Sequence, residues 1–174
     1  MNSVRTIKRP FPTILLVWFA MVGLDFLLHA GLLSRFYITG NNFLLSPLDA
    51  FQRIPLGYAA LLLQAILLVW LVPHFSIGSL QQTLWFGLKL GLLLIGAQML
   101  GLVSITTIEP TLAIAWFVSQ TLEVALGAVV VQQVMQTDSL RRVTIQVTVF
   151  VLFALILTIT LQSLGLSPAV QIPQ

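Results

Sequence analysis

The fold is decided first by residues 12–33, which read PTILLVWFAMVGLDFLLHAGLL. A helix of about 20 apolar residues crosses the roughly 30 Å of hydrocarbon in a bilayer, and this stretch reaches that length. Backbone amides and carbonyls cannot stay unpaired in lipid, so the spanning form that we expect is a helix. Its two titratable residues are Asp25 and His29. The stretch therefore predicts a transmembrane helix that carries polar groups inside the membrane.

Four further stretches have a similar length and composition: residues 56–72, 84–105, 111–134 and 143–164. Of the 174 residues, 58% are hydrophobic and only 7% are charged, and the mean hydropathy is +1.02. Soluble domains carry about 25% charged residues, so a water-soluble globule is excluded. We predict an all-α transmembrane bundle of five spans, forming a single integral-membrane domain over residues 1–174. Its four-helix core is followed by an added C-terminal helix.

The distribution of Lys and Arg predicts the orientation of the chain. Basic residues gather on the cytoplasmic side of membrane proteins, counted over short connections. With the N-terminus inside, five basic residues lie on the inner side and two on the outer side. The inner set is Arg5, Lys8, Arg9, Arg141 and Arg142, and the outer set is Arg35 and Arg53. We expect a bacterial cytoplasmic (inner) membrane protein with its N-terminus in the cytoplasm and its C-terminus outside.

The net charge of +3 and the sequence pI near 10 reflect this topology and do not indicate nucleic-acid binding. The absence of Cys excludes disulfides and thiolate metal sites. The first connection, residues 34–55, is long and too apolar for a freely solvated linker. We expect it to lie at the membrane interface or against another subunit. Its apolar residues are Phe36, Tyr37, Phe43, Leu44, Leu45 and Phe51.

Four ionisable residues fall inside the predicted spans: Asp25, His29, Lys89 and Glu123. A charge at the centre of a membrane helix costs about 2.5 to 3.5 kcal/mol on insertion scales, so such residues usually turn toward protein. Asp25 and His29 lie one helical turn apart, on a face that also carries Trp18.

Glu123 lies near the middle of the fourth span. Helical spacing places Trp116 and Gln120 on its side of the helix, which we expect to face protein.

Each of these residues has more than one interpretation. Asp25 and His29 form either a hydrogen-bonded pair that fixes helix packing, or part of a proton relay, ligand site or pigment site. Lys89 either pairs with Glu123 or extends toward the inner headgroups. Glu123 is either functional or a neutral carboxyl that is hydrogen-bonded to Gln120 or Gln98.

Gly87 and Gly91 form a Gly-x-x-x-Gly step in the third span. Small residues allow two helix backbones to approach closely, so we expect this helix to be central in the bundle. Metal-binding His-x-x-x-His and Glu-x-x-His spacings, the Gly-x-Ser-x-Gly elbow, phosphate loops and dinucleotide fingerprints are all missing. We therefore predict neither a metal site nor an enzyme.

Two segments carry a resemblance: residues 23–30 (GLDFLLHA), and residues 113–118 (AIAWFV) leading to Glu123. They resemble a group of small uncharacterised bacterial membrane proteins, with Asp-x-x-x-His in the first helix and Trp followed by Glu in a later one. The resemblance covers roughly residues 14–134. It implies that Asp25, His29, Trp116 and Glu123 belong to one arrangement, and it implies no activity.

Three functions are compatible with the sequence. The first is a non-enzymatic accessory or assembly subunit of a larger membrane complex, whose partners are the lipid bilayer and other membrane subunits or a second copy. The second is a proton-linked carrier of small solutes that uses Asp25, His29 and Glu123. The third is a subunit that binds haem or chlorophyll, with His29 as the ligand and Trp18 or Trp116 against the ring.

Overall fold

The computed structural model describes residues 7–38, 43–75, 77–137 and 139–168. Arg5, which contributes to the predicted orientation, lies outside the described residues. Within them the chain forms helices and no strand, and five of these helices are long and apolar enough to cross a membrane. The predicted all-α bundle with five candidate spans is confirmed, and the chain is a multi-pass membrane protein. The elements are α1 (Pro10–Phe26), η1 (Leu27–Leu32), α2 (Ser34–Ile38), α3 (Pro47–Leu71), η2 (Val72–Phe75), α4 (Leu80–Ile105), α5 (Pro110–Gln136) and α6 (Leu140–Ser163).

The second span begins earlier than the predicted residue 56. Helix α3 starts at Pro47, because the Ser46 hydroxyl accepts a hydrogen bond from the Asp49 amide at 3.2 Å and proline is favoured in the first turn. Pro55 lies inside this helix and does not end it. The first connection is therefore much shorter than the predicted residues 34–55, and it contains the short helix α2.

The other helix ends differ from the prediction by a few residues. Ser79 and Ser139 accept hydrogen bonds from the Gln82 and Arg142 amides, and they start α4 and α6 at Leu80 and Leu140. Serine is a preferred N-cap because its side chain satisfies an amide that has no partner within the helix.

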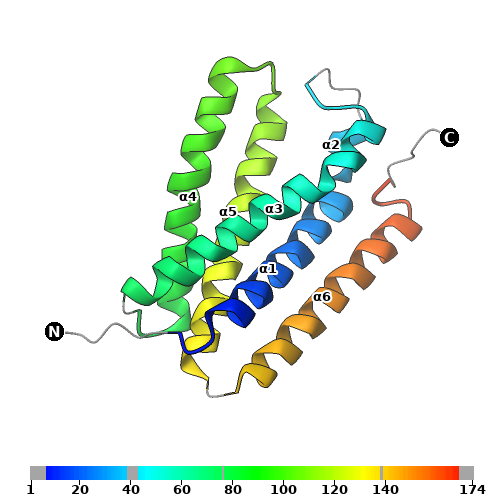
Figure 1. The fold of residues 1–174 in the computed structure, drawn as a ribbon. Helices are drawn as coiled ribbons and strands as arrows, with labels where there is room; N and C mark the ends of the chain where they lie inside the picture. Colours follow the sequence, from blue (N-terminus) through cyan, green and yellow to red (C-terminus); the bar gives the residue numbers. More distant parts are fainter. Residues whose placement is uncertain (1–6, 39–42, 76, 138, 169–174) are drawn as a thin grey trace.

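Helix α5 occupies the centre of the bundle and contacts α1, α3, α4 and α6 (Figure 1). Helix α4, in contrast, packs extensively against α5 alone among the described helices, and most of its surface is exposed. The prediction of a central third span is therefore wrong. A Gly-x-x-x-Gly step indicates one close contact, whereas a central position requires several neighbours.

That close contact is between α4 and α5. A Cβ atom added at Gly87 would lie 2.7 Å from the Ala125 Cα, and one at Gly91 would lie 3.0 Å from the Thr121 Cα. Real Cβ atoms do not approach a backbone at 2.7 Å, so only glycine fits at position 87. The two helix backbones approach each other as closely as glycine, which has no side chain, allows.

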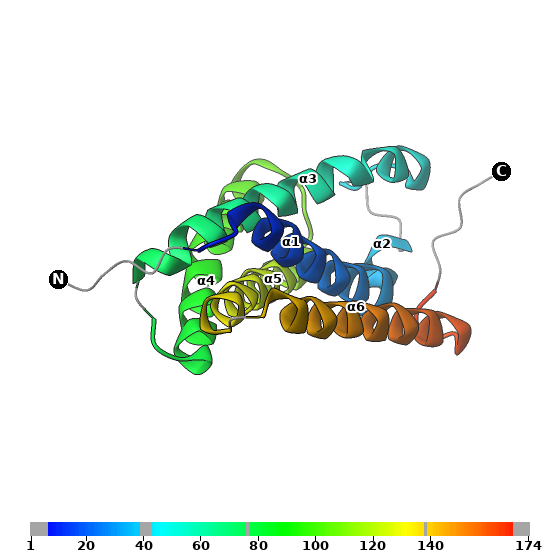
Figure 2. The same ribbon diagram turned by 60° about the horizontal axis from the view of Figure 1, so that its bottom comes forward.

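Helix α6 lies beside α1 along much of its length, as both views show (Figures 1 and 2). Val151 on α6 fills the space beside Gly23, and Thr158 lies against Gly31. The last span is thus packed directly on the helix that carries Asp25 and His29.

The connection after α1 folds back on its own chain. Phe36, Tyr37, Phe43 and Leu44 pack on the buried start of α5, around Leu112. This contact accounts for four of the six apolar residues of the predicted connection, whereas Leu45 and Phe51 stay exposed, and it brings the Tyr37 hydroxyl to Trp116 of α5.

Candidate functional site

The end of the first membrane helix is π-helical over Leu27–Leu32, and His29 lies in this segment. The Leu33 amide donates to the Leu28 carbonyl at 2.7 Å, five residues back, which is the π-helical pattern. Such segments are rare and occur frequently at functional sites. The carbonyls at its end find partners on α6 and just after it: Gln162 Nε2 of α6 donates to the Ala30 oxygen at 3.0 Å, and Ser167 Oγ, four residues beyond α6, donates to the Gly31 oxygen.

Three titratable side chains from two helices meet beside this segment. His29 Nε2 lies 3.7 Å from Asp25 Oδ1 and 3.8 Å from Glu123 Oε1. One nitrogen or oxygen atom from each residue falls within 4.8 Å of the other two. We call Asp25, His29 and Glu123 the polar cluster. It joins α1 and η1 to the central helix α5.

Glu123 is the innermost member of the polar cluster. It lies thirteen residues from each end of α5, which runs from position 110 to 136, and is therefore about 20 Å from either end. Its side chain is 1% exposed, compared with 27% for Asp25 and 21% for His29. Neither carboxyl oxygen of Glu123 has a hydrogen-bond partner in the described structure. Buried polar groups are nearly always paired, so this carboxyl group calls for an explanation.

Aromatic residues cover one side of the polar cluster. The Tyr37 hydroxyl bonds to His29 Nδ1 and accepts a hydrogen bond from Trp116 Nε1 at 2.7 Å. Phe43 lies against Trp116, with 6.2 Å between the ring centroids. Burial raises the pKa of the Tyr37 hydroxyl well above its ordinary value, although the Trp116 hydrogen bond acts in the opposite direction. Tyr37 is therefore a neutral hydrogen-bonding group that fixes the His29 ring.

Ser119 provides a further polar atom on α5, one turn before Glu123. Its hydroxyl lies 3.4 Å from His29 Nε2 and also donates to the Ala115 carbonyl at 2.9 Å. The serine therefore borders the polar cluster and remains tied to its own helix.

Lys89 lies apart from the polar cluster. It is exposed on α4, and among the described residues it forms no ion pair. The predicted alternative of a Lys89–Glu123 pair is wrong, because Lys89 lies on the exposed side of α4. The buried face that α4 turns toward α5 is formed by Thr83, Gly87, Gly91, Ile95 and Met99. The other predicted alternative, extension toward the headgroups, agrees with its exposure.

The two glutamines proposed as partners of Glu123 do not bond to it. Gln98 is exposed on α4, whereas Gln120 is partly buried on α5. Because both Glu123 oxygens are unpaired, the predicted hydrogen bond to Gln120 or Gln98 is wrong.

Trp18, predicted on the Asp25 face, donates from Nε1 to the Tyr58 carbonyl at 2.9 Å and connects α1 to α3.

Tyr37 and Ser119 are site residues that were not predicted from the sequence. Ser119 could have been found, because it precedes Glu123 by four residues and shares its helical face. The position of Tyr37 depends on the π-helical segment and the short helix α2, and neither has a recognisable signal in the sequence.

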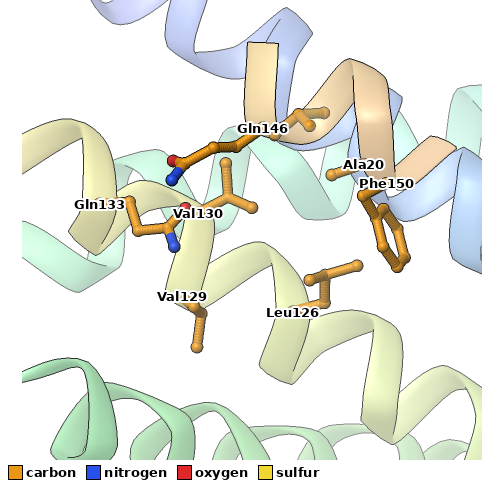
Figure 3. A pocket seen from close by; sticks show the side chains of 8 residues that line it. Ala20, Leu126, Val129, Val130, Gln133, Gln146 and Phe150 are labelled. Carbon is orange, nitrogen blue, oxygen red and sulfur yellow. The ribbon is translucent and has the colours of Figure 1, made fainter. Parts of the chain in front are cut away.

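A separate hollow of about 180 Å³ lies between α1, α5 and α6 (Figure 3). Its walls are mainly apolar, with Gln133 and Gln146 as the polar contributors. None of the polar-cluster residues lines it. The hollow is therefore distinct from the polar cluster.

The composition of the polar cluster is that of a site that could hold a cation. It combines two carboxyl groups with one imidazole, and no described Lys or Arg lies within ion-pairing distance of them.

Compared with known proteins, the sequence matches no protein-family model and no curated protein, and the fold matches no solved structure.

Proposed function

We propose that this protein is a small carrier that binds a cation or cationic solute inside the membrane at the polar cluster of Asp25, His29 and Glu123. The observation that carries the proposal is the Glu123 carboxyl group, which is fully buried, lacks a hydrogen-bond partner and faces His29. Ionisable residues inside membrane helices typically mark ion or substrate pathways.

The electrostatics favour a positively charged ligand. Two carboxylates at membrane depth have a large desolvation cost unless an opposite charge accompanies them. His29 is the one basic side chain within ion-pairing distance in the described structure, and as a neutral imidazole it supplies no charge. A bound cation would compensate the carboxylates and use the free lone pairs of Glu123.

The arrangement also suggests a path to the site. Asp25 and His29 retain part of their surface, whereas Glu123 is closed off behind them. A cation would meet Asp25 first and Glu123 last. Tyr37 and Trp116 close the side formed by the first connection, so their hydrogen bond is a candidate gate.

Reconstituted vesicles provide the test. We expect purified protein in liposomes to support uptake of at least one cation from a panel of monovalent, divalent and organic cations. Glu123→Gln and Asp25→Asn should abolish that uptake. Glu109→Gln is the matched control, because it makes the same chemical change at an exposed carboxyl group outside the polar cluster. Uptake that persists in both cluster variants would refute the carrier proposal.

The location and orientation of the chain belong to the same proposal. We place it in a bacterial inner membrane, with the N-terminus in the cytoplasm and the C-terminus outside, on the basis of its Lys and Arg distribution. Because the chain has no Cys, single cysteines can be introduced without removing native ones. A cysteine at Ser79 or Ser139 should resist a membrane-impermeant thiol reagent applied to intact cells, whereas one at Ser46 should react. The reverse pattern would invert the topology.

A second function, that of an accessory subunit in a larger complex, is favoured by the start of α3. Every residue from 48 to 57 is exposed, and Figure 2 shows these turns standing apart from α1 and α5. The exposed side chains include Phe51, Ile54 and Leu56. Purification in a mild detergent followed by mass measurement tests this function. A second chain should accompany the protein, and a solitary monomer would count against it.

The geometry favours a small cation over haem or chlorophyll. A macrocycle needs a free nitrogen on His29, but Nδ1 bonds to Tyr37 and Nε2 faces two carboxyl groups. Trp18 is hydrogen-bonded to α3 and does not stack over the histidine. Visible absorption bands of haem or chlorophyll in the purified protein would instead support a cofactor-binding subunit.

A further inference from the structure

We infer that Asp25, His29 and Glu123 form a binding site for one divalent transition-metal ion of the Mn²⁺, Fe²⁺, Co²⁺ and Zn²⁺ class. This inference rests on the proposed cation-binding function and specifies the ligand. The sequence contains no metal motif, because the three ligands come from two helices separated by most of the chain. They become a set only in the folded bundle.

The geometry is close to that of a coordination sphere. Oxygen and nitrogen ligands lie about 2.0 to 2.2 Å from such ions, so neighbouring ligands in a tetrahedral site are about 3.4 Å apart. The ligand atoms here are separated by 3.7 Å and 3.8 Å from the His29 nitrogen, and all three lie within 4.8 Å of one another. Small side-chain rotations of the two carboxyl groups would close the remaining gap.

A second, independent observation supports a ligand at this position. Glu123 is almost completely buried, and neither of its oxygens has a partner. A carboxyl group left unpaired at such a position is costly, and coordination of an ion is one of the ways in which proteins satisfy it. The unpaired Oε1 atom faces the ligand nitrogen of His29.

Charge balance selects a divalent ion. With two carboxylates and a neutral imidazole, an ion of charge +2 brings the site to a net charge of zero. A monovalent ion would leave one negative charge uncompensated at membrane depth, where charges are expensive. Ions of higher charge would leave an excess of positive charge.

The donor set selects the class of ion. Imidazole nitrogen suits Zn²⁺, iron and related ions, whereas Ca²⁺ and Mg²⁺ prefer sites built from oxygen ligands. The lack of Cys removes the thiolates that select soft ions such as Cu⁺. Three protein ligands also leave a coordination position open, as in sites where an ion exchanges water or a substrate.

Tyr37 acts as a positioning residue. A metal-bound histidine usually donates its second ring N–H to an oxygen atom, which fixes the ring orientation. The Tyr37 hydroxyl lies at His29 Nδ1 and is itself held by Trp116 Nε1. With Nε2 on the metal, Nδ1–H would donate to the Tyr37 oxygen, which has lone pairs for both donors.

The experiment is a Co²⁺ titration of the full chain in detergent after removal of bound metal with a chelator. We expect one Co²⁺ per chain, visible d–d absorption bands and displacement by Zn²⁺, with no displacement by Mg²⁺ or Ca²⁺. Glu123→Gln, Asp25→Asn and His29→Gln should each weaken binding by roughly 100-fold or more. Tyr37→Phe should weaken it by about 10-fold, as expected for loss of an outer partner. Glu109→Gln should leave binding unchanged.

Absence of stoichiometric Co²⁺ binding by the wild-type chain would overturn the inference, as would unchanged affinity in folded Glu123→Gln and Asp25→Asn variants. X-ray absorption of the Zn²⁺-loaded wild-type protein requires no variant. It should detect one imidazole among otherwise oxygen ligands, and a different first shell would also overturn the inference. Glu123-dependent uptake of a monovalent or organic cation without metal binding would remove the metal site and leave the carrier. Metal binding without uptake of any cation would support the metal site and refute the carrier proposal.

Discussion

Helix α5 presents one side to α4 and another to α1, and the two interfaces are built on different principles. Against α4 the contact is made by Gly87 and Gly91, and the backbones approach as closely as glycine permits. Against α1 the contact holds Asp25, His29 and Glu123, with an unpaired carboxyl group in the middle. One interface is optimised for packing, whereas the other retains polar groups that packing alone does not require.

The difference separates stability from function. In lipid the hydrophobic effect does not drive helices together, so close van der Waals contact between small residues supplies much of the association energy. The α4–α5 contact provides this. The α1–α5 contact is also close, with Val17 and Met21 packed against Gly127, but it additionally keeps three titratable groups together, which is the pattern expected at a site rather than at a structural joint.

The largest effect is expected at the small-residue interface. Gly87→Val should lower the free energy of unfolding by about 3 kcal/mol, because its side chain would overlap the α5 backbone. Gly101→Val is the control, since no atom lies within 4 Å of a Cβ built there, and it should change stability by less than about 1 kcal/mol. Reversible unfolding followed by circular dichroism in mixed micelles measures both.

The same two variants test whether the α4–α5 interface and the polar cluster are independent. Folded Gly87→Val protein should keep its Co²⁺ affinity, because α4 contributes no ligand to the polar cluster. Loss of metal binding together with stability would mean that the two interfaces are coupled.

Replacing the unpaired carboxyl group should stabilise the protein. In the presence of a chelator, Glu123→Met should raise the free energy of unfolding by about 1 to 3 kcal/mol, because a buried group without a partner is removed. At a metal concentration 100 times the Kd, the wild type should gain about 2.7 kcal/mol and the variant nothing. Thermal melting with and without Zn²⁺ tests this. A variant less stable than wild type in chelator would show that Glu123 is structural.

A smaller effect is expected at the tyrosine that joins His29 to Trp116. Tyr37→Phe should reduce stability by about 0.5 to 1.5 kcal/mol, because it removes the acceptor of the Trp116 N–H. Tyr58→Phe is the matched control, since the Tyr58 hydroxyl makes no hydrogen bond in the described structure and α3 uses the Tyr58 carbonyl instead. Equal losses in the two variants would contradict the role given to Tyr37. Chemical denaturation of both proteins is the measurement.

The smallest effect is expected at Lys89. Lys89→Gln should change the free energy of unfolding by no more than about 0.5 kcal/mol and leave cation binding unaltered, because the side chain is exposed and unpaired. The same titrations detect any change. A loss of cation affinity as large as that expected for Asp25→Asn would instead support the Lys89–Glu123 ion pair that was predicted from the sequence.

The features that could be predicted from the sequence are those on which lipid imposes a strong constraint. Five apolar stretches predicted five spans, and the four-residue spacing of Asp25 and His29 predicted their proximity. The features that could not be predicted are those that depend on which helices meet. Gly87 and Gly91 indicate that one helix lies close to α4, but they do not indicate how many helices surround it. The depth of Lys89 in the membrane could not show on which face of α4 it lies.

The site was only half predictable for a related reason. Glu123 was recognisable because a short acidic side chain in mid-span has few alternatives to facing protein. The contribution of Tyr37 depends on the π-helical segment that precedes it, and no residue pattern identifies such a segment. The second span was predicted to begin at residue 56, directly after Pro55, but α3 continues through this proline. Proline is tolerated in membrane helices when nearby groups satisfy the freed carbonyl.

Cysteine cross-linking in native membranes can show whether Asp25 and Glu123 lie side by side, since the chain has no Cys of its own. Cysteines placed together at Asp25 and Glu123 should be joined rapidly by a short thiol-specific cross-linker, whereas a pair at Lys89 and Glu123 should remain unlinked. No linkage of the first pair would mean that α1 and α5 do not bring their carboxyl groups together in the membrane, and efficient linkage of the second pair would place Lys89 at the polar cluster instead.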